Sequence, residues 1–297
     1  MTDAALAARP VVERRRGEGL TTATLVGPAT IFVAVSLFGP LAILLRYSLN
    51  GFAEATKTMV EAVTLANYVK FFTDPYYTAI LFTTVRIAVL VTIVCLVLGF
   101  PLAYVVARTQ SRFKNLLIMS IVLPLFVGNA VRAAGWMVVF GNKGFFNTTL
   151  GWLGLIGAPI EIMFTEKAVV IGIIAVNLPF MVLSLQSVIE GVARALEEAA
   201  YSLGAPPLVM FRRVLWPLAL PGVLAGTILT FILAMNAYAT PFLLGGPLFN
   251  MMAPLIYNQF TQQSNWPFGG AIAVILMTVT LSLTVAANLV IQRRAVR

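Results

Sequence analysis

Histidine is absent from this chain of 297 residues, and cysteine occurs only once, as Cys95 within an apolar run. The absence of histidine removes the commonest general base and the commonest metal ligand. A lone cysteine can build neither a disulfide framework nor a cysteine-based metal site. An enzyme working inside a membrane would need a nucleophile with a base, or a metal cluster, so the sequence argues against an enzyme.

Charged residues are scarce, at 10% of the chain, whereas hydrophobic residues reach 60% and the mean hydropathy is +0.93. Soluble domains carry about 25% charged residues, so this composition predicts a polytopic membrane protein surrounded by a lipid bilayer. The net charge of +9 does not indicate a nucleic-acid partner. The basic residues lie beside hydrophobic runs, where they act as an orientation signal.

Long apolar runs define the expected fold, since a helix that crosses the hydrocarbon layer needs about 20 mostly apolar residues. We predict an all-α fold with six transmembrane helices, over residues 22–49, 79–107, 116–140, 168–189, 217–244 and 268–292. The first apolar run is too long for a signal-peptide core and lacks a small-residue cleavage site, which favours a retained anchor. Without internal repeats, we expect a basic leader at 1–21 and one transmembrane domain at 22–297, which includes the loop at 190–216.

Basic residues that flank spans stay in the cytoplasm, so their distribution predicts both termini there. With the N-terminus inside, the inner side carries Arg9, Arg14, Arg15, Arg16, Arg108, Arg112, Lys114, Arg194, Arg212, Arg213, Arg293, Arg294 and Arg297. The outer side carries only Lys57, Lys70, Lys143 and Lys167, with Arg46 at a span end. Two long external loops are expected at 50–77 and 141–167, the second with a short interfacial helix.

The loop at 190–216 is a cluster of charged residues between two apolar runs of the second half of the chain. Residues 193–203 are strong helix formers, with Glu197 and Glu198 on the polar side and Leu196, Ala199, Ala200 and Leu203 on the other. Gly204 is suited to end this helix, and Pro206-Pro207 suits the start of a second short helix at 208–215. The pattern predicts a helix-turn-helix that docks on a partner, or else an interfacial connector without one.

Glu198-Ala199-Ala200, Gly204 and Val214-Leu215-Trp216-Pro217 resemble the EAA signature of ABC-importer permeases. That signature is Glu-Ala-Ala, three residues, Gly, nine residues and Ile-x-Leu-Pro, so Val214 and Trp216 depart from it but stay apolar. The resemblance runs from about residue 65 to the C-terminus and is to spermidine/putrescine-type permeases. It rests on the segments 66–68, 98–104, 123–126, 131–132, 177–181 and 266–269.

This resemblance implies a MetI-like type I fold in a bacterial inner membrane, with a second, related permease, two ABC ATPase subunits and a periplasmic binding protein as partners. The loop at 190–216 would be the helix that seats in a groove of the ATPase. The residues expected in that contact are Glu197, Glu198, Ala199, Ala200, Gly204, Ala205, Phe211 and Arg212. The chain has no Gly-x-x-x-x-Gly-Lys-Ser/Thr phosphate loop. ATP and Mg²⁺ are therefore expected on the ATPase, and no cofactor on this chain.

Ionisable residues inside spans are costly and are functional candidates by default. The predicted spans contain Arg86 and Arg132 and no acid. Arg86 is expected to snorkel to the interface, whereas Arg132 either pairs with a helix C-terminus or lines a translocation path. The other candidates for the path are Asn177, Asn236, Tyr238 and Thr240. Each of these could instead make a hydrogen bond between helices.

The cargo is expected to bind weakly to neutral polar and aromatic groups of the path, with selectivity supplied by the binding protein. Polyamines are the substrates that the resemblance implies. The absence of acids, together with Arg86 and Arg132, leaves zwitterionic amino-acid derivatives or opines open. An ion-coupled secondary transporter or channel is disfavoured, because intramembrane carboxylates and an inverted repeat are both lacking.

Overall fold

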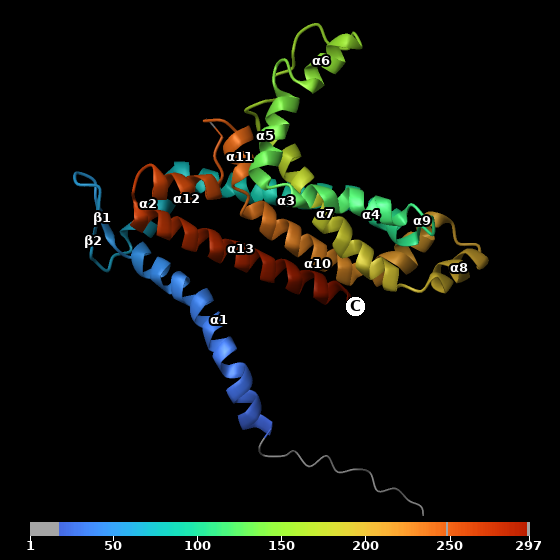
Figure 1. The fold of residues 1–297 in the computed structure, drawn as a ribbon, viewed down its shortest axis with the longest axis horizontal. Coiled ribbons are helices and arrows are strands. Elements are labelled where there is room, and N and C mark those ends of the chain that lie inside the picture. Colours follow the sequence, from blue (N-terminus) through green and yellow to red (C-terminus); the bar gives the residue numbers. More distant parts are fainter. Residues whose placement is uncertain (1–17, 248, 296–297) are drawn as a thin grey trace, which may run out of the picture. The chain divides into compact units, whose positions relative to one another are not determined.

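The computed structural model describes residues 18–247 and 249–295, and the side chains of residues 26–247 and 249–289. The arginines of the predicted leader and of the C-terminal tail lie outside the described side chains. The chain divides into two units between Tyr47 and Ser48. The described part of the first unit belongs to the helix α1 (Glu18–Ser48), whose segment Val26–Ser48 is long and apolar enough to cross a membrane (Figure 1).

The second unit is mainly helical, with one two-stranded antiparallel sheet at its start. Its elements in chain order are β1 (Gly51–Ala53), β2 (Thr58–Val60), α2 (Ala66–Thr73), α3 (Pro75–Arg108), α4 (Lys114–Val122), η1 (Leu123–Phe126), α5 (Asn129–Phe140), α6 (Phe145–Trp152), α7 (Glu166–Gly191), α8 (Arg194–Ser202), α9 (Pro207–Met210), η2 (Phe211–Leu215), α10 (Trp216–Met235), α11 (Ala239–Leu244), α12 (Met252–Thr261) and α13 (Trp266–Ala295). Here η1 is a 3₁₀-helix and η2 a π-helical turn.

Among the described residues, five helices are long and apolar enough to cross a membrane, or six if one bent pair counts as a single span. The predicted all-α fold with six transmembrane helices is confirmed on that count. The second span begins at residue 75, earlier than the expected 79. Asp74 is the reason, since its carboxylate accepts the Tyr76 N–H at 2.9 Å and Pro75 occupies the first helical position.

The predicted continuous helix at 116–140 is wrong, because the chain there is broken into two helical segments. Lys114–Phe126 and Asn129–Trp152 are bent by 99° relative to each other. Pro124 lies in the 3₁₀ turn η1, and Gly128, with an extended backbone at ψ 144°, precedes α5. A proline and an extended residue so close together interrupt the i to i−4 hydrogen bonds of an α-helix.

The predicted span at 217–244 is wrong at both ends. It begins at Pro207, which suits a first helical position, and runs through η2 into α10 as far as Met235. The expected separate helix at 208–215 is therefore the beginning of the span itself. At the other end α10 stops at Met235, and α11 forms separately with Pro241 in its first turn, where the missing N–H of a proline is tolerated.

The core of the second unit is formed by α3, α7 and α10, which pack against one another, with α13 on α10 (Figure 1). Glycines make this close packing possible. A Cβ at Gly99 would lie 2.9 Å from Met181 Cγ, and one at Gly226 would lie 2.7 Å from Met181 Sδ. A Cβ at Gly222 would lie 2.9 Å from Val188 Cβ. Small residues at helix crossings are typical of membrane bundles.

The same substitution at two helical glycines should therefore have opposite effects on stability. Gly222→Ala is expected to destabilise the protein by about 1–3 kcal/mol, because the new methyl group overlaps a stiff β-branched neighbour. Gly135→Ala is expected to stabilise it by about 0.5–1 kcal/mol, since nothing lies within 4 Å of that position in α5. Thermal unfolding in detergent measures both, and equal midpoints for the two variants would contradict this packing.

Candidate functional site

Helix α8, between the spans α7 and α10, has the predicted glycine at its end. Gly204 has φ +78°, which favours glycine strongly. The Ala205 N–H donates to the Ala200 carbonyl at 3.0 Å, and the Gly204 N–H donates to the Tyr201 carbonyl at 2.9 Å. These are the two bonds of a Schellman motif. Helix α8 (Arg194–Ser202) thus has an end fixed by backbone hydrogen bonds.

The faces of α8 differ from the prediction. Glu197 is 6% exposed and points inward, whereas Leu196 and Leu203 are 47% and 88% exposed. The expectation that Glu197 shares an outer polar face with Glu198, opposite the leucines, is wrong. The reason is Arg108, which binds Glu197 and holds it against α3. The outward face of α8 therefore combines Glu198 with apolar side chains.

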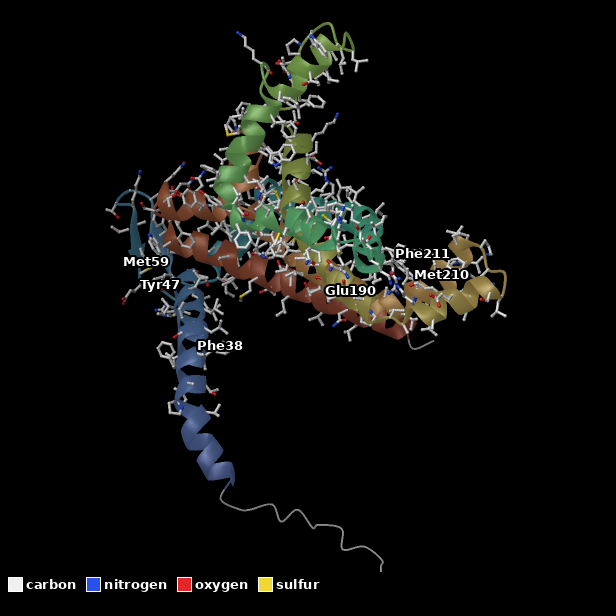
Figure 2. All side chains as sticks on the ribbon, turned by 45° about the vertical axis from the view of Figure 1, so that its right-hand side comes forward. Phe38, Tyr47, Met59, Glu190, Met210 and Phe211 are labelled. Carbon is white, nitrogen blue, oxygen red and sulfur yellow. The ribbon has the colours of Figure 1, made fainter. Side chains whose placement is uncertain are left out.

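The residues expected to contact an ATPase differ in their exposure. Those that are exposed are Glu198, Ala199, Gly204 and Arg212; those that are half-buried are Ala200, Ala205 and Phe211; Glu197 is buried. The Phe211 ring packs on Phe100 at 5.1 Å and on Trp216 at 5.9 Å between centroids, which joins α8's neighbour η2 to α3. Figure 2 shows Glu190, Met210 and Phe211 at the same end of the helix bundle.

Basic residues of separate segments meet at the α8 end of the bundle. Arg194 donates to the backbone carbonyl of Arg108, and Lys114 Nζ lies 2.8 Å from Glu190 Oε1. All three cations belong to loops that the sequence assigns to the inner side. Their meeting at one end of the bundle agrees with the assignment of all three to the same side of the membrane.

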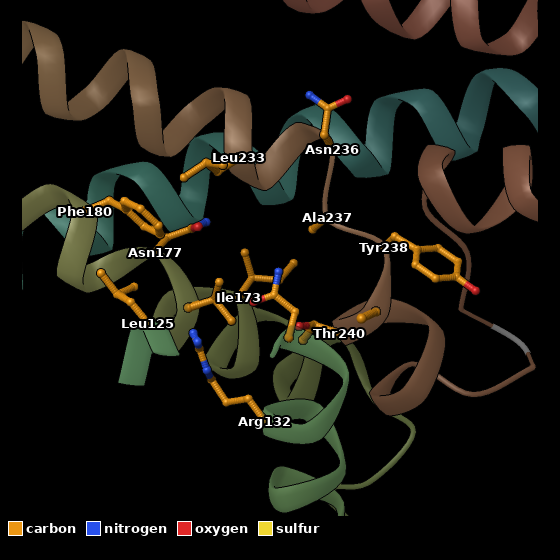
Figure 3. A pocket seen from close by; sticks show the side chains of 13 residues that line it. Leu125, Arg132, Ile173, Asn177, Phe180, Leu233, Asn236, Ala237, Tyr238 and Thr240 are labelled. Carbon is orange, nitrogen blue, oxygen red and sulfur yellow. The ribbon is translucent and has the colours of Figure 1, made fainter. Parts of the chain in front are cut away.

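A cavity of about 380 Å³ lies where α5, α7 and the break between α10 and α11 meet. Thirteen side chains line it (Figure 3). They are Leu125, Asn129, Arg132, Ile173, Val176, Asn177, Phe180, Leu233, Asn236, Ala237, Tyr238, Ala239 and Thr240. The structure thus brings together all five residues predicted for the path, and no acidic residue is among those thirteen.

Arg132 lines the cavity and also binds backbone carbonyls at the end of η1. Its Nη2 donates to the carbonyl of Pro124 and, at 2.8 Å, to that of Val127, both at the end of η1. The Pro124 carbonyl also accepts the Val127 N–H at 3.2 Å, so the guanidinium adds a side-chain donor where η1 ends and the chain bends. The other guanidinium nitrogens, Nε and Nη1, are buried and have no partner among the described residues. Arg132 therefore stabilises the bend and also offers donors to the cavity.

Asn177 is the most deeply buried polar residue of the cavity, with 1% exposure. Its Nδ2 has no hydrogen-bond partner among the described residues. Figure 3 shows the Asn177 amide and the Arg132 guanidinium at the same end of the cavity. An unpaired buried amide is costly, on the order of 1–3 kcal/mol, unless water or a ligand meets it. The cavity is consequently rich in donors at this end.

The remaining candidates lie at the break between α10 and α11. Asn236 ends α10, and its Nδ2 donates to the Ile232 carbonyl at 2.9 Å. Tyr238 packs on Tyr257 with ring centroids 4.9 Å apart, and Thr240 is 5% exposed. Figure 3 shows the Asn236 amide turned away from the Arg132 and Asn177 groups. Asn236 thus lines the cavity, while its amide is hydrogen-bonded to the last turn of α10.

Because Asn236 both ends α10 and lines the cavity, Asn236→Leu is expected to lower solute uptake without disturbing assembly. The lost hydrogen bond would cost about 0.5–1.5 kcal/mol, too little to unfold the bundle. Uptake by cells that express the variant, normalised to membrane-inserted protein, measures the effect. Unchanged uptake would remove Asn236 from the path.

Acidic residues do occur at the ends of a span, contrary to the prediction. Helix α7 begins at Glu166, which follows the N-cap Thr165, and it extends past Glu190. A negative charge in the first helical turn is favoured by the helix dipole. Arg86 forms an ion pair with Glu166, the first residue of α7, and both side chains are about half exposed. Glu166 is paired with Arg86 and Glu190 with Lys114, and neither acid lines the cavity.

The two loops predicted on the outer side contain short elements. The segment 50–77 holds the β1–β2 hairpin and α2, and the segment 141–167 holds the predicted short helix as α6. Asn147, which is 5% exposed, donates to the carbonyls of Gly141 at 3.2 Å and Ile160 at 3.0 Å. That side chain therefore fixes the loop that carries α6.

Comparisons with known proteins support this architecture. A family model described as "Binding-protein-dependent transport system inner membrane component" matches residues 62–297. The spermidine/putrescine transport system permease protein PotB of Escherichia coli (strain K12) is 37% identical over 79% of this chain and 83% of that protein. PotB of Haemophilus influenzae is 35% identical over 78% of this chain and 82% of that protein.

Among solved structures, a bacterial alginate ABC transporter, in complex with an alginate pentasaccharide-bound periplasmic protein, has a similar chain. The TM-score is 0.78 at 17% identity, over 95% of this chain and 98% of that one. At this level of identity the likeness concerns the fold alone. It agrees with the fold class predicted from the apolar runs.

Proposed function

Since the chain belongs to the family of binding-protein-dependent transport system inner membrane components, it is a permease of an ABC importer, and we propose that its cargo is a polyamine. The fold is the MetI-like type I permease fold. We further propose that the chain resides in a bacterial inner membrane with both termini in the cytoplasm. In the assembled importer a second, related permease would complete the translocation path.

The observation that carries the coupling part of this proposal is the geometry of α8. It presents Glu198 and Ala199 at the surface between two spans, ends in a Schellman motif, and is surrounded by basic residues. A rigid, exposed helix of this kind suits a groove on a cytoplasmic ATPase. We propose one ATPase subunit on this chain and one on the second permease. ATP and Mg²⁺ would be held by those subunits, with no cofactor on this chain.

A periplasmic binding protein is the partner proposed for the outer side. The cavity is small and its lining is mainly apolar and neutral, with Arg132 as its charged member. A path that carries a solute needs weak contacts, because a tight site would slow release. Selectivity would then come from the binding protein. The alginate transporter with a similar fold was solved in complex with a periplasmic protein that has an alginate pentasaccharide bound.

The support for a polyamine comes from the PotB relatives, which are 35% and 37% identical to this chain over the segments that match. A second candidate cargo, a zwitterionic amino-acid derivative or an opine, is favoured by one feature of the cavity. Arg132 and Asn177 offer unpartnered donors and none of the lining residues is a carboxylate. A carboxylate on the solute would accept those donors, whereas an ammonium group would not.

Calorimetric titration of the cognate binding protein distinguishes these cargoes. Putrescine, spermidine and an opine would each be titrated, and uptake of the same compounds would be measured in cells with and without this permease. A polyamine importer is expected to bind putrescine or spermidine and to lose their uptake with the permease. Tight binding of the opine alone would replace the first proposal by the second. Binding of none of them would contradict both.

A further inference from the structure

Glu197 lies in α8, the helix proposed to contact the ATPase, but its side chain binds residues of this chain instead. Arg108 Nε donates to Glu197 Oε1 at 2.9 Å, and Arg108 Nη2 donates to the same oxygen. The Tyr104 hydroxyl donates to Oε2 at 3.0 Å. Both carboxylate oxygens are therefore occupied, and the side chains of Arg108 and Glu197 are only 13% and 8% exposed.

These contacts join α8 to the last turns of α3, 89 residues earlier in the chain. Arg194, the first residue of α8, adds a second tie by donating to the Arg108 backbone carbonyl. That carbonyl lies at the C-terminus of α3, where helical partners are lacking. The chain itself already connects α8 to α7 and α9. The Glu197 contacts attach α8 to α3 as well, so that α8 is connected to all three core helices, α3, α7 and α10.

A buried ion pair is weak as a source of stability, because desolvation of both charges offsets much of their attraction. Charge-assisted hydrogen bonds do, however, fix geometry strongly. In this chain the pair links the one helix proposed to meet the ATPase with a helix that packs against α7 and α10. Residues of α7 line the cavity, Ile173 and Asn177 among them.

We infer that Glu197 is a positioning residue of transport, which transmits displacement of α8 to α3 through Arg108 and Tyr104. In this role Glu197 faces the permease interior, while Glu198 faces the partner. The inference rests on the proposed docking of an ATPase on α8. It differs from that proposal because it assigns to Glu197 a contact within this chain rather than a contact with the ATPase.

The test uses the complete importer, with ATPase, second permease and binding protein, reconstituted in proteoliposomes. Glu197→Gln and Arg108→Gln each remove one charge, and the double variant Glu197→Arg with Arg108→Glu exchanges the charges. With putrescine as the probe, uptake per ATP hydrolysed is expected to fall about tenfold in the single variants, within the usual range of coupling between sites. Complex yield and basal ATP hydrolysis should remain near wild type. The exchanged pair should recover most of the lost coupling.

A second readout does not depend on the solute. Spin labels at Ser202→Cys and Val105→Cys, both exposed positions, report the distance between α8 and α3 when Cys95 is replaced by serine. In the wild-type background this distance should stay constant when ATP binds. In the Glu197→Gln background it should change, because α8 then moves without α3.

Arg86→Gln is the matched control, because Arg86 and Glu166 also link α3 to a neighbouring helix but lie half-exposed, away from α8. Its coupling ratio should equal that of wild type. Normal coupling in assembled Glu197→Gln complexes would overturn the inference. So would a charge exchange that restores complex yield without restoring coupling, since the pair would then only support folding. If the wild-type permease does not bind an ATPase, the proposed function is contradicted, and so is the inference that depends on it.

Discussion

Replacing Glu198 by lysine, or Gly204 by valine, is expected to abolish association of the ATPase while membrane insertion of the permease stays intact. Glu198 is the exposed acid of α8, so a lysine there reverses the charge of the docking face. Gly204 has φ +78°, a conformation that costs a β-branched residue more than about 1–2 kcal/mol. Valine would therefore break the two hydrogen bonds of the Schellman motif and displace the end of α8.

Co-purification with the ATPase measures this effect, and a loss of at least about tenfold is expected, as for a central interface residue. The chain offers two matched controls in the predicted outer segment. Gly154 also has a positive φ of +68° with nothing within 4 Å of its position, and Glu161 is an exposed acid. Gly154→Val and Glu161→Lys should leave the ATPase bound. Wild-type yield of ATPase with Glu198→Lys would contradict the docking role.

Asn177→Leu is expected to reduce uptake about tenfold while leaving the protein as stable as wild type or more stable. The Asn177 Nδ2 is buried without a partner among the described residues, and removing an unsatisfied polar group from a core is close to neutral or stabilising. If the amide meets the solute during passage, its removal acts on transport alone. A transport defect without a folding defect is the result that separates a path residue from a packing residue.

Thr230→Val is the control for Asn177→Leu, because Thr230 is fully buried in α10, its Oγ1 also lacks a partner among the described residues, and it does not line the cavity. Its uptake should match that of wild type. Uptake would be measured in whole cells, and the unfolding midpoint would be measured in detergent. Equal uptake in wild type and Asn177→Leu would exclude Asn177 from the path, and a lower midpoint would show a structural role instead.

The long apolar runs were sufficient to predict the spans α3, α7 and α13, because each run has the length of a membrane crossing and few charges within it. The end of α8 was also predictable, since Gly204 followed by Pro206-Pro207 leaves few alternatives to a helix stop and a new start. In both cases a local property decides the structure. The residues proposed for the path were found because polar groups are conspicuous within apolar helices.

The breaks in the third and fifth spans were not predictable from the prolines alone. Pro101 and Pro179 lie inside intact helices, whereas Pro124 and Pro241 accompany breaks. What differs is the tertiary surroundings. At the first break, for example, Arg132 supplies donors to the carbonyls at the end of η1.

Pairing between distant residues was the other information missing from one sequence. Glu197 and Arg108 are 89 residues apart, and Arg86 and Glu166 are 80 apart. Neither helical periodicity nor a short motif relates such positions. The inward direction of Glu197, and with it the division of labour between Glu197 and Glu198, therefore emerged only from the folded chain.

Site-specific photo-cross-linking from Ala199 tests the central claim most directly, since this residue is exposed in the middle of α8. A photoreactive residue would replace Ala199 in the full importer within native membranes, and Gly154 would serve as the position on the opposite predicted side. The expected result is an adduct between position 199 and the ATPase, with none from position 154. Adducts of position 199 with lipid alone, or with the periplasmic binding protein, would contradict the account.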